Sequence, residues 1–438
     1  MKIKILTILF LFCCVNMFSQ QTIDLQTCIE KGLENNFSIK IVRNNQKISD
    51  NNLSIGNAGM LPSVNLNASY SGTNNNVEQY PADGSATITN DINNSGIDLG
   101  VSLSWTIFDG FKMFADYDKL KELQQMGELN TRLAVENFVA DISAEYYNFV
   151  RQSIGLDNLK SAVRLSKERL RIVEARYNIG SMSRLDLQQA RVDFNSDSSR
   201  FIRQQEVVFS SRVRLNKLMA VEDIEQKQMP ADSSISFDAL LQKDDLWNNV
   251  LQNNTLLLLS EKDKSINIKN LQAAQSKNYP YVRISAGYGY ASNKYGLSTY
   301  RQQNTLGMNY GVTLGFNIFD GFNRVREQRN AKLQIENSEI EKMNLRQSLQ
   351  SDFADIWNSY RNNMELVTLE QENLNSATEN YDIAIERYKL GDLSGIELRE
   401  AQNSLLEAGE RLVQAQYNTK LCEISLMQIS GKVYSMKN

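Results

Sequence analysis

The chain contains two copies of one unit, placed 211 residues apart. Residues 100–111 read GVSLSWTIFDGF and residues 311–322 read GVTLGFNIFDGF, so eight of these twelve positions are identical. At the same offset, without a gap, ARYNIGSMSRLDLQQA (175–190) aligns with ERYKLGDLSGIELREA (386–401). A duplication of this kind constrains the fold strongly, because both halves are expected to form the same elements in the same order.

Two very long helices are predicted in each half. Apolar residues recur every three or four positions, which is the spacing of a helical stripe. Only 4 of the 438 residues are proline, so little interrupts a long helix. About seventy residues at 1.5 Å each give a rod of roughly 105 Å, and such hairpins favour coiled-coil packing. The predicted helices are 109–179, 183–218, 320–390 and 394–429.

Signals for helix ends flank these segments. Asp109 and Asp320, each in a Phe-Asp-Gly-Phe sequence, can accept hydrogen bonds from the first free N–H groups of a helix. Gly180 and Gly391 are predicted to end the two longer helices.

Four shorter segments alternate between apolar and polar residues, and are predicted to be strands: 63–72, 97–108, 281–291 and 307–319. Leu99, Val101 and Leu103, for example, share a face opposite Gly100 and Ser102. About ten residues is the length that a tilted strand needs to cross a bilayer. A soluble sandwich would also alternate, but its polar face need not be rich in Gly, Ser and Asn. The sequence also offers no second sheet to cover the apolar face.

Four strands cannot close a barrel, and an open sheet edge is not stable in lipid. We therefore expect several chains to share one barrel, and the strand pattern alone leaves two or three chains open. The loops 72–96 and 291–306 would face outward, where barrel loops are longer.

The N-terminus has the features of a secretory signal peptide, predicted as residues 1–20. Lys2 and Lys4 precede an apolar run that is too short for a membrane anchor. Its removal lowers the basic count from 47 to 45 against 51 acidic residues, a net charge of −6, which argues against a nucleic-acid partner. The remaining chain is divided into a first repeat (21–220), an inter-repeat linker (221–239), a second repeat (240–431) and a C-terminal tail (432–438).

Residues for enzyme chemistry are missing. The chain has no histidine, and we find no Cys-x-x-Cys, phosphate-binding loop or nucleophile elbow. We therefore expect no enzymatic activity, no catalytic or metal site and no cofactor. Cys28 and Cys422 lie on apolar helix faces, so two buried free thiols are the first expectation and a disulfide the alternative.

The duplication, the strand pairs ending in FDGF, and the turns RYNIGSMSRLD and RYKLGDLSGIEL together resemble the TolC family. The resemblance covers essentially the whole mature chain. It implies a mixed α+β membrane protein: a homotrimer with a 12-stranded barrel in the outer membrane and a helical coiled-coil tunnel in the periplasm. It also implies an exit duct of a tripartite efflux or type I secretion system. Its partners would be a periplasmic adaptor (membrane fusion) protein and an inner-membrane pump or transporter.

A secreted helical coiled-coil scaffold protein is the alternative, and solubility without detergent would distinguish it. The cargo (drug, metal or polypeptide) is left open by the sequence, because the inner-membrane partner selects it.

The resemblance also implies roles for residues near the two turns. Acidic residues ring the narrow periplasmic mouth in that family, and the matching positions are Asp186, Glu397 and Glu400. Confined carboxylates attract cations, so a cation-selective constriction is expected. An ordinary acidic helix start is the alternative.

A latch at this mouth is a further hypothesis. Tyr388 matches a tyrosine that helps to close the mouth in family members, but Leu393 stands where they carry arginine. Arg184 could pair with Glu397 instead. The turn residues are the expected adaptor contacts, although both glycines could serve only as helix stops: Arg176, Tyr177, Gly180, Arg387 and Gly391.

Overall fold

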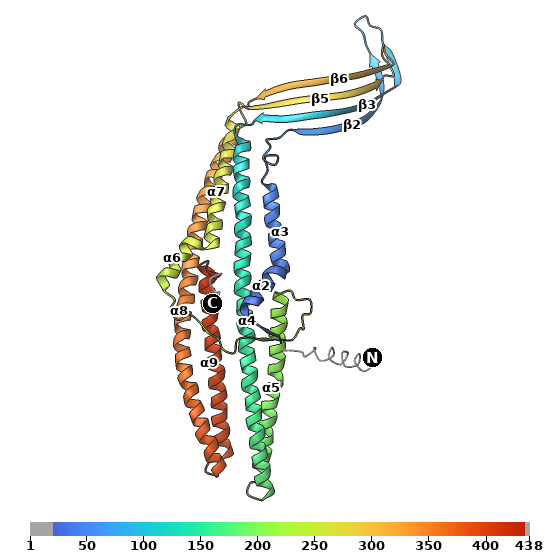
Figure 1. The fold of residues 1–438 in the computed structure, drawn as a ribbon. Coiled ribbons are helices and arrows are strands. Elements are labelled where there is room, and N and C mark those ends of the chain that lie inside the picture. Colours follow the sequence, from blue (N-terminus) through green and yellow to red (C-terminus); the bar gives the residue numbers. More distant parts are fainter. Residues whose placement is uncertain (1–20, 434–438) are drawn as a thin grey trace, which may run out of the picture. The chain divides into compact units, whose positions relative to one another are not determined.

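The computed structural model describes residues 21–433, so the predicted signal peptide and residues 434–438 lie outside the described part. The described chain is mostly helical, with one four-stranded and one two-stranded sheet (Figure 1). Two compact units divide it. Among the described residues, the first unit consists of 21–45, Leu129–Leu258 and 344–433, and the second of Gln46–Glu128 and Leu259–Met343. Each unit therefore takes segments from both copies of the duplication.

The elements follow the same order in both halves. In the first half they are β1 (Gln21–Ile23), α2 (Leu25–Asn35), α3 (Phe37–Asn52), β2 (Ser63–Gln79), β3 (Thr87–Phe108), α4 (Lys112–Asn178) and α5 (Arg184–Leu218). In the second half they are β4 (Gln228–Pro230), α6 (Lys243–Asn253), α7 (Thr255–Gln275), a short 3₁₀ turn η1 (Ser276–Asn278), β5 (Tyr281–Lys294), β6 (Gln302–Gly315), α8 (Asn323–Leu390) and α9 (Gly395–Ile429).

The strand ends differ from the sequence prediction. Strands β2 and β3 include most of the predicted loop 72–96, and strands β5 and β6 extend into the predicted loop 291–306. Some of the added pairs, such as Asn74 with Asn93, are polar on both sides, and others, such as Val77 with Thr89, join an apolar to a polar residue. Ladder hydrogen bonds join backbone groups and do not require apolar alternation. The alternation alone therefore made all four strands too short at this end of the sheet. At the other end, strand β6 stops at Gly315 rather than at residue 319.

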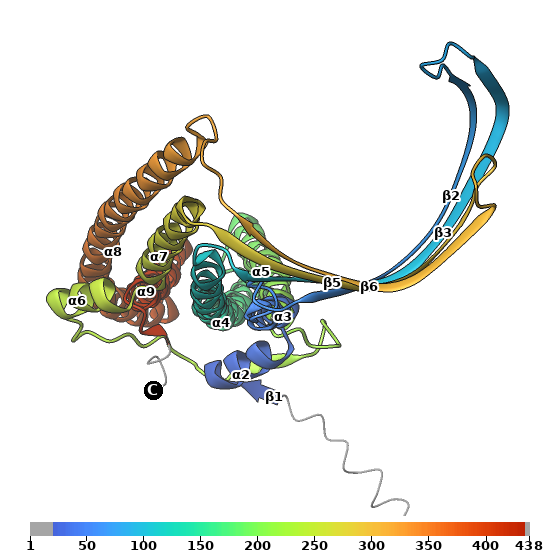
Figure 2. The same cartoon turned by 90° about the horizontal axis from the view of Figure 1, so that it is seen from above.

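The four long strands form one antiparallel sheet in the order β2-β3-β5-β6, which lies in the second unit. Figure 2 shows this sheet curving along its strands, with the β2–β3 hairpin reaching past β5 and β6. Strand β3 pairs directly with β5, so the two strand pairs of the duplication join into one surface.

The Phe-Asp-Gly-Phe sequences carry the chain from sheet to helix. Both oxygens of the Asp109 carboxylate accept a hydrogen bond from the Met113 amide at 3.1 Å, as expected of a helix cap. Gly110 and Phe111 both adopt left-handed backbone angles, with φ of 72° at each. The Phe111 ring packs on edge against Phe108 at 5.1 Å between centroids, which holds this unusual conformation for a residue other than glycine.

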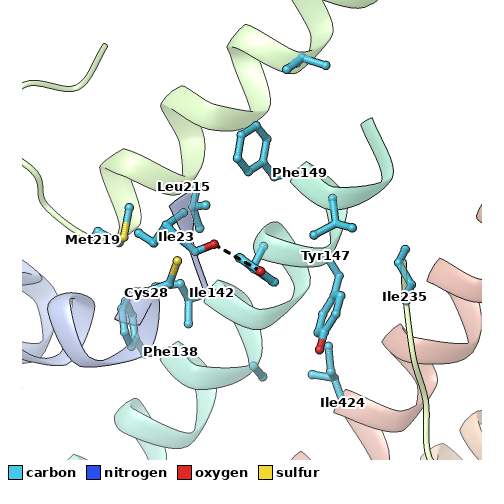
Figure 3. Packing of buried hydrophobic residues seen from close by; sticks show 14 of the residues in the cluster. Ile23, Cys28, Phe138, Ile142, Tyr147, Phe149, Leu215, Met219, Ile235 and Ile424 are labelled. Atoms are coloured by element: carbon cyan, nitrogen blue, oxygen red, sulfur yellow. Dashed lines mark hydrogen bonds between the residues drawn. The ribbon is translucent and has the colours of Figure 1, made fainter. Parts of the chain in front are cut away.

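A small parallel sheet and a helical core lie in the first unit. Strand β1 pairs with β4 of the segment between the two halves. Behind it, Cys28, Ile142 and Leu215 are fully buried, and Figure 3 shows these side chains meeting from different elements. The Tyr146 hydroxyl donates to Asp232 at 2.8 Å, which satisfies its polar group inside this core.

Cys28 and Cys422 are both free thiols, as expected in preference to a disulfide, but only Cys28 is buried and Cys422 is partly exposed. Burial raises the pKa of the Cys28 thiol to about 12, so it stays protonated and unreactive at neutral pH. Between residues 21 and 433, no helix is long and apolar enough to cross a membrane.

Candidate functional site

The strand register gathers the apolar residues on one face of the four-stranded sheet. Across β3, β5 and β6 the rows run Leu99–Tyr290–Leu306 and Val101–Tyr288–Met308. Strand β2 extends the same rows, for example with Leu66 beside Val101. Leu66 is 72% and Tyr310 83% exposed, so the face is uncovered within the chain. Isolated exposed apolar residues are ordinary in soluble proteins, but a continuous apolar face this wide is not.

The opposite face of the same sheet is polar and lined by small residues. One row runs Asn67–Gly100–Gly289–Gly307, and the next runs Asn65–Ser102–Gly287–Asn309. The Asn67 amide donates to the Ser102 hydroxyl at 3.1 Å. Two faces with such different chemistry fit a wall between lipid and water, because lipid-facing and water-facing residues alternate in membrane strands.

Two helix turns lie at one end of the first unit, residues 179–183 between α4 and α5 and residues 391–394 between α8 and α9; we call them the hairpin turns. Gly180 has a φ of 79° and Gly391 a φ of 90°, and no atom lies within 4 Å of where a Cβ would sit. In the first turn, the Ser181 amide donates to the Arg176 carbonyl at 2.9 Å, and the second turn repeats this bond. The glycines therefore end their helices as predicted.

The helix that follows each turn begins with a reciprocal capping box. Asp186 accepts hydrogen bonds from the amide and hydroxyl of Ser183 at 3.1 and 2.7 Å. Glu397 accepts the same pair from Ser394 at 3.0 and 2.8 Å. These bonds lower the pKa of the Glu397 carboxyl, because they stabilise its charged form. Asp186 and Glu397 therefore each help to cap the helix that they begin. The nearby Glu400 is exposed, and its carboxylate forms no hydrogen bond within the described residues.

Tyr388 lies beneath the second hairpin turn and is only 1% exposed. It belongs to a buried cluster with Val173, Leu187 and Leu398, which come from α4, α5 and α9. Burial raises the pKa of its phenol, and no hydrogen bond to the hydroxyl is found in the described residues. The guanidinium of Arg176 lies 5.5 Å from the centre of its ring.

Arg184 and Glu397, the suggested latch pair, form no ion pair with each other within the described single chain. Both are exposed, and they lie at different hairpin turns. Arg387 and Tyr177 are exposed as well, whereas Arg176 is half-buried because it contacts the end of α8.

Two buried ion pairs join these helices, one between the two hairpins and one within the first hairpin, and the sequence analysis predicted neither. Arg399 on α9 donates to the two oxygens of Asp197 on α5 at 2.7 and 2.8 Å. Arg169 on α4 pairs with the buried Asp193 of α5. The sequence did carry a signal for both carboxylates. Asp193 lies three residues after Ala190, and Asp197 four residues after Asp193, so both lie on the apolar stripe of α5 rather than on its solvated face.

A protein-family model described as outer membrane efflux protein matches residues 28–221 and 246–432. The chain belongs to this family. The resemblance to TolC-like proteins is thereby confirmed.

Two curated relatives are members of the same group. The outer membrane protein TolC of Vibrio cholerae serotype O1 is 25% identical over 173 residues, which is 39% of this chain and 38% of the relative. The outer membrane efflux protein BepC of Brucella suis biovar 1 is 19% identical over 411 residues, covering 93% of this chain and 85% of the relative.

Solved structures share the fold of this outer membrane efflux family member. The CmeC outer membrane channel of Campylobacter jejuni superposes with a TM-score of 0.75 at 18% identity, over 93% of this chain and 85% of that one. CusC, described for conformational changes that accompany folding and transmembrane channel formation, gives a TM-score of 0.73 at 18% identity, over 93% and 92%.

Proposed function

We propose that this chain is the outer-membrane exit duct of a tripartite efflux or type I secretion system, and that it conducts substrates passively from the periplasm to the outside. The observation that carries the proposal is the four-stranded sheet with one apolar and one polar face. Membership of the outer membrane efflux protein family supports it, and so does the channel fold of its structural neighbours.

Closure of the sheet into a barrel requires more than one chain. Strands β2 and β6 are the two edges of the sheet, and each leaves one row of backbone groups without a partner in the described sheet. In lipid such groups must be paired, and joining the β6 edge of one chain to the β2 edge of the next achieves this. Three chains give twelve strands, which is the arrangement that we propose.

The helical end would form the periplasmic mouth of the duct. Asp186, Glu397 and Glu400 are exposed near the hairpin turns, and three copies of each would place nine carboxylates around a narrow opening. Carboxylates held close together repel one another and attract cations, so this mouth is proposed to conduct cations in preference to anions. Neutral variants (Asp186→Asn, Glu397→Gln and Glu400→Gln together) should then lower the cation-to-anion permeability ratio.

The exposed hairpin turns are the proposed docking points for a periplasmic adaptor that leads to an inner-membrane pump or transporter. Gly180 and Gly391 have free space beside them, so a side chain there would project outward rather than into the core. A bulky change at the adjacent Ser181 or Asp392 should weaken capture of the adaptor. Unaltered capture would place docking elsewhere.

The test of the duct itself is fractionation followed by conductance. The full chain, expressed with residues 1–20 in place in a cell with two membranes, should sediment with the outer membrane and need detergent for extraction. Reconstituted in a planar bilayer, it should open discrete ion-conducting channels. A protein that stays soluble without detergent and gives no conductance would instead be a secreted helical scaffold.

A further inference from the structure

The α4–α5 hairpin and the α8–α9 hairpin of the first unit meet through a contact in which α4 supplies the side chain and α8 supplies the backbone carbonyls. Arg176, in the last turn of α4, donates from Nη2 to the carbonyl oxygens of Lys389 at 2.9 Å and Tyr388 at 3.5 Å, near the end of α8. Its guanidinium also lies over the ring of Tyr388. A cation suits this place, because the last carbonyls of a helix lack partners and carry the negative end of its dipole.

The duplication gives each member of this contact a counterpart. The offset of 211 residues relates Arg176 to Arg387 and Tyr177 to Tyr388. The counterparts are not engaged in the same way. Tyr388 is 1% exposed but Tyr177 is 37% exposed. The Arg387 guanidinium is exposed and forms no hydrogen bond or ion pair with any residue from 21 to 433, although its charge acts on Glu397.

The helix face around Arg387 is also uncovered. Ile383 is 54% exposed and lines a groove on α8 together with Arg387. Leu390 does not distinguish the two halves, because it is 78% exposed and its counterpart Ile179 is 80% exposed. The counterpart of Ile383 is Ile172, which packs against the buried cluster at the hairpin contact. The second hairpin therefore presents a face that the first hairpin already buries within the chain.

We propose that the occupant of this face is a second copy of this chain. Arg387 of one chain then donates to the final carbonyls of α4 in the neighbouring chain, and its guanidinium covers the ring of that chain's Tyr177. The inference rests on the proposed function, because that function requires an oligomer. It adds the residues that form the contact between neighbouring chains at the hairpin turns. The contact joins the second half of one chain to the first half of the next. It is therefore a head-to-tail contact, which can repeat around a closed ring.

The two kinds of junction are not equal in strength. Within the chain, Arg399 and Asp197 also join the hairpins through a buried ion pair. Their counterparts at the offset of 211 are Gln188 and Ala408, which cannot form an ion pair. The junction between chains therefore lacks this pair and depends more on its arginine, so it is the junction that separates first.

Site-specific photo-crosslinking tests the proposal in the full-length protein in its membrane. Arg387 is replaced by p-benzoylphenylalanine, the sample is irradiated, and adducts are mapped by peptide mass spectrometry. The matched control carries the same residue in place of Arg176. We expect position 387 to link two chains, with the adduct on residues 177–179, and position 176 to link within one chain to residues 388–390.

A native mass measurement on the same preparation distinguishes failure of the proposed Arg387 contact from failure of the proposed duct. If the particle is an oligomer but position 387 links within its own chain, to another protein or not at all, the inference is overturned and the duct remains. A monomeric particle would overturn both.

A charge variant gives a second readout. Arg387→Glu should lower the temperature at which the detergent-extracted oligomer dissociates into chains, whereas Arg387→Lys, which keeps the cation, should lower it less. Equal dissociation temperatures for the wild type and both variants would contradict the proposal.

Discussion

The guanidinium of Arg399 holds both carboxylate oxygens of Asp197, a side chain with 0% exposure, and so joins α9 of the second half to α5 of the first. Two parallel hydrogen bonds fix both the distance between the guanidinium and the carboxylate and their relative orientation. A buried charge that loses its partner is costly, whereas the intact pair adds little net stability over apolar packing. The pair therefore specifies how the two hairpins align.

Removal of the Arg399 side chain should strongly lower the stability of the α4–α5 and α8–α9 hairpins. Arg399→Ala leaves Asp197 buried and unpaired, which costs about 3–5 kcal/mol in comparable sites. The measurement is thermal loss of helical circular dichroism in detergent. The control is Arg361→Ala, because Arg361 lies 3.9 Å from Glu365 in an exposed pair that is worth under about 1 kcal/mol. Similar melting of both variants would contradict the role given to the pair.

Acidification should loosen the start of α9 through Glu397. The folded-state pKa of this carboxyl is lowered by its hydrogen bonds to Ser394, so its stabilising contribution is complete above the ordinary glutamate pKa. The contribution is lost as the pH falls through the lowered folded-state value. Hydrogen exchange of the first turn of α9, corrected for intrinsic rate, should show greater protection in the wild type than in Ser394→Ala at neutral pH. The difference should shrink in acid to the part that comes from the Ser394 hydroxyl accepting from the Glu397 amide, because that bond does not need the carboxylate. An undiminished difference in acid would exclude this mechanism.

Neighbouring residues on strand β3 should respond oppositely to a new charge. Val101 lies on the apolar face and Ser102 on the polar face. Val101→Arg should block membrane assembly, because an arginine facing mid-bilayer lipid costs about 2–4 kcal/mol. Ser102→Arg should assemble and change conductance instead. The yield of heat-resistant oligomer in the outer membrane and single-channel conductance measure both effects, and equal yields would reject the assignment of the faces.

The two glycines of the Phe-Asp-Gly-Phe sequences offer a matched pair. Gly110 and Gly321 both have left-handed backbone angles, so alanine costs roughly 1–2 kcal/mol at either position. A Cβ at Gly110 would also overlap the Ser276 carbonyl oxygen, whereas at Gly321 the nearest atom is 3.8 Å away. Gly110→Ala should therefore lower the melting temperature more than Gly321→Ala, with about 1–3 kcal/mol of added overpacking. The reverse order would show that this close approach does not matter.

Local patterns predicted the elements well, because the signals for them are local. The Asp109 cap, the glycine stops and the alternation of β3 each depend on a few neighbouring residues. Contacts between distant segments were harder to predict. The position of Asp197 on an apolar stripe indicated burial, but only the fold brings Arg399 to it from 202 residues away.

The site residues divide in the same way. The sequence identified Asp186 and Glu397 as acidic residues past the turns, and the structure adds that each caps its own helix. The partner of Arg176 could not be predicted, because backbone carbonyls at a helix end carry no sequence signal. The extension of β2 and β3 beyond the predicted ends was missed for a related reason, since backbone pairing alone leaves no side-chain alternation to detect.

The central claim is that several chains share one barrel in the outer membrane. The most direct test is native mass spectrometry of the particle that detergent extracts from isolated outer membranes. We predict a mass of three mature chains. A monomer, or a protein recovered without detergent, would contradict the shared barrel, and the apolar face of the sheet would then need another covering.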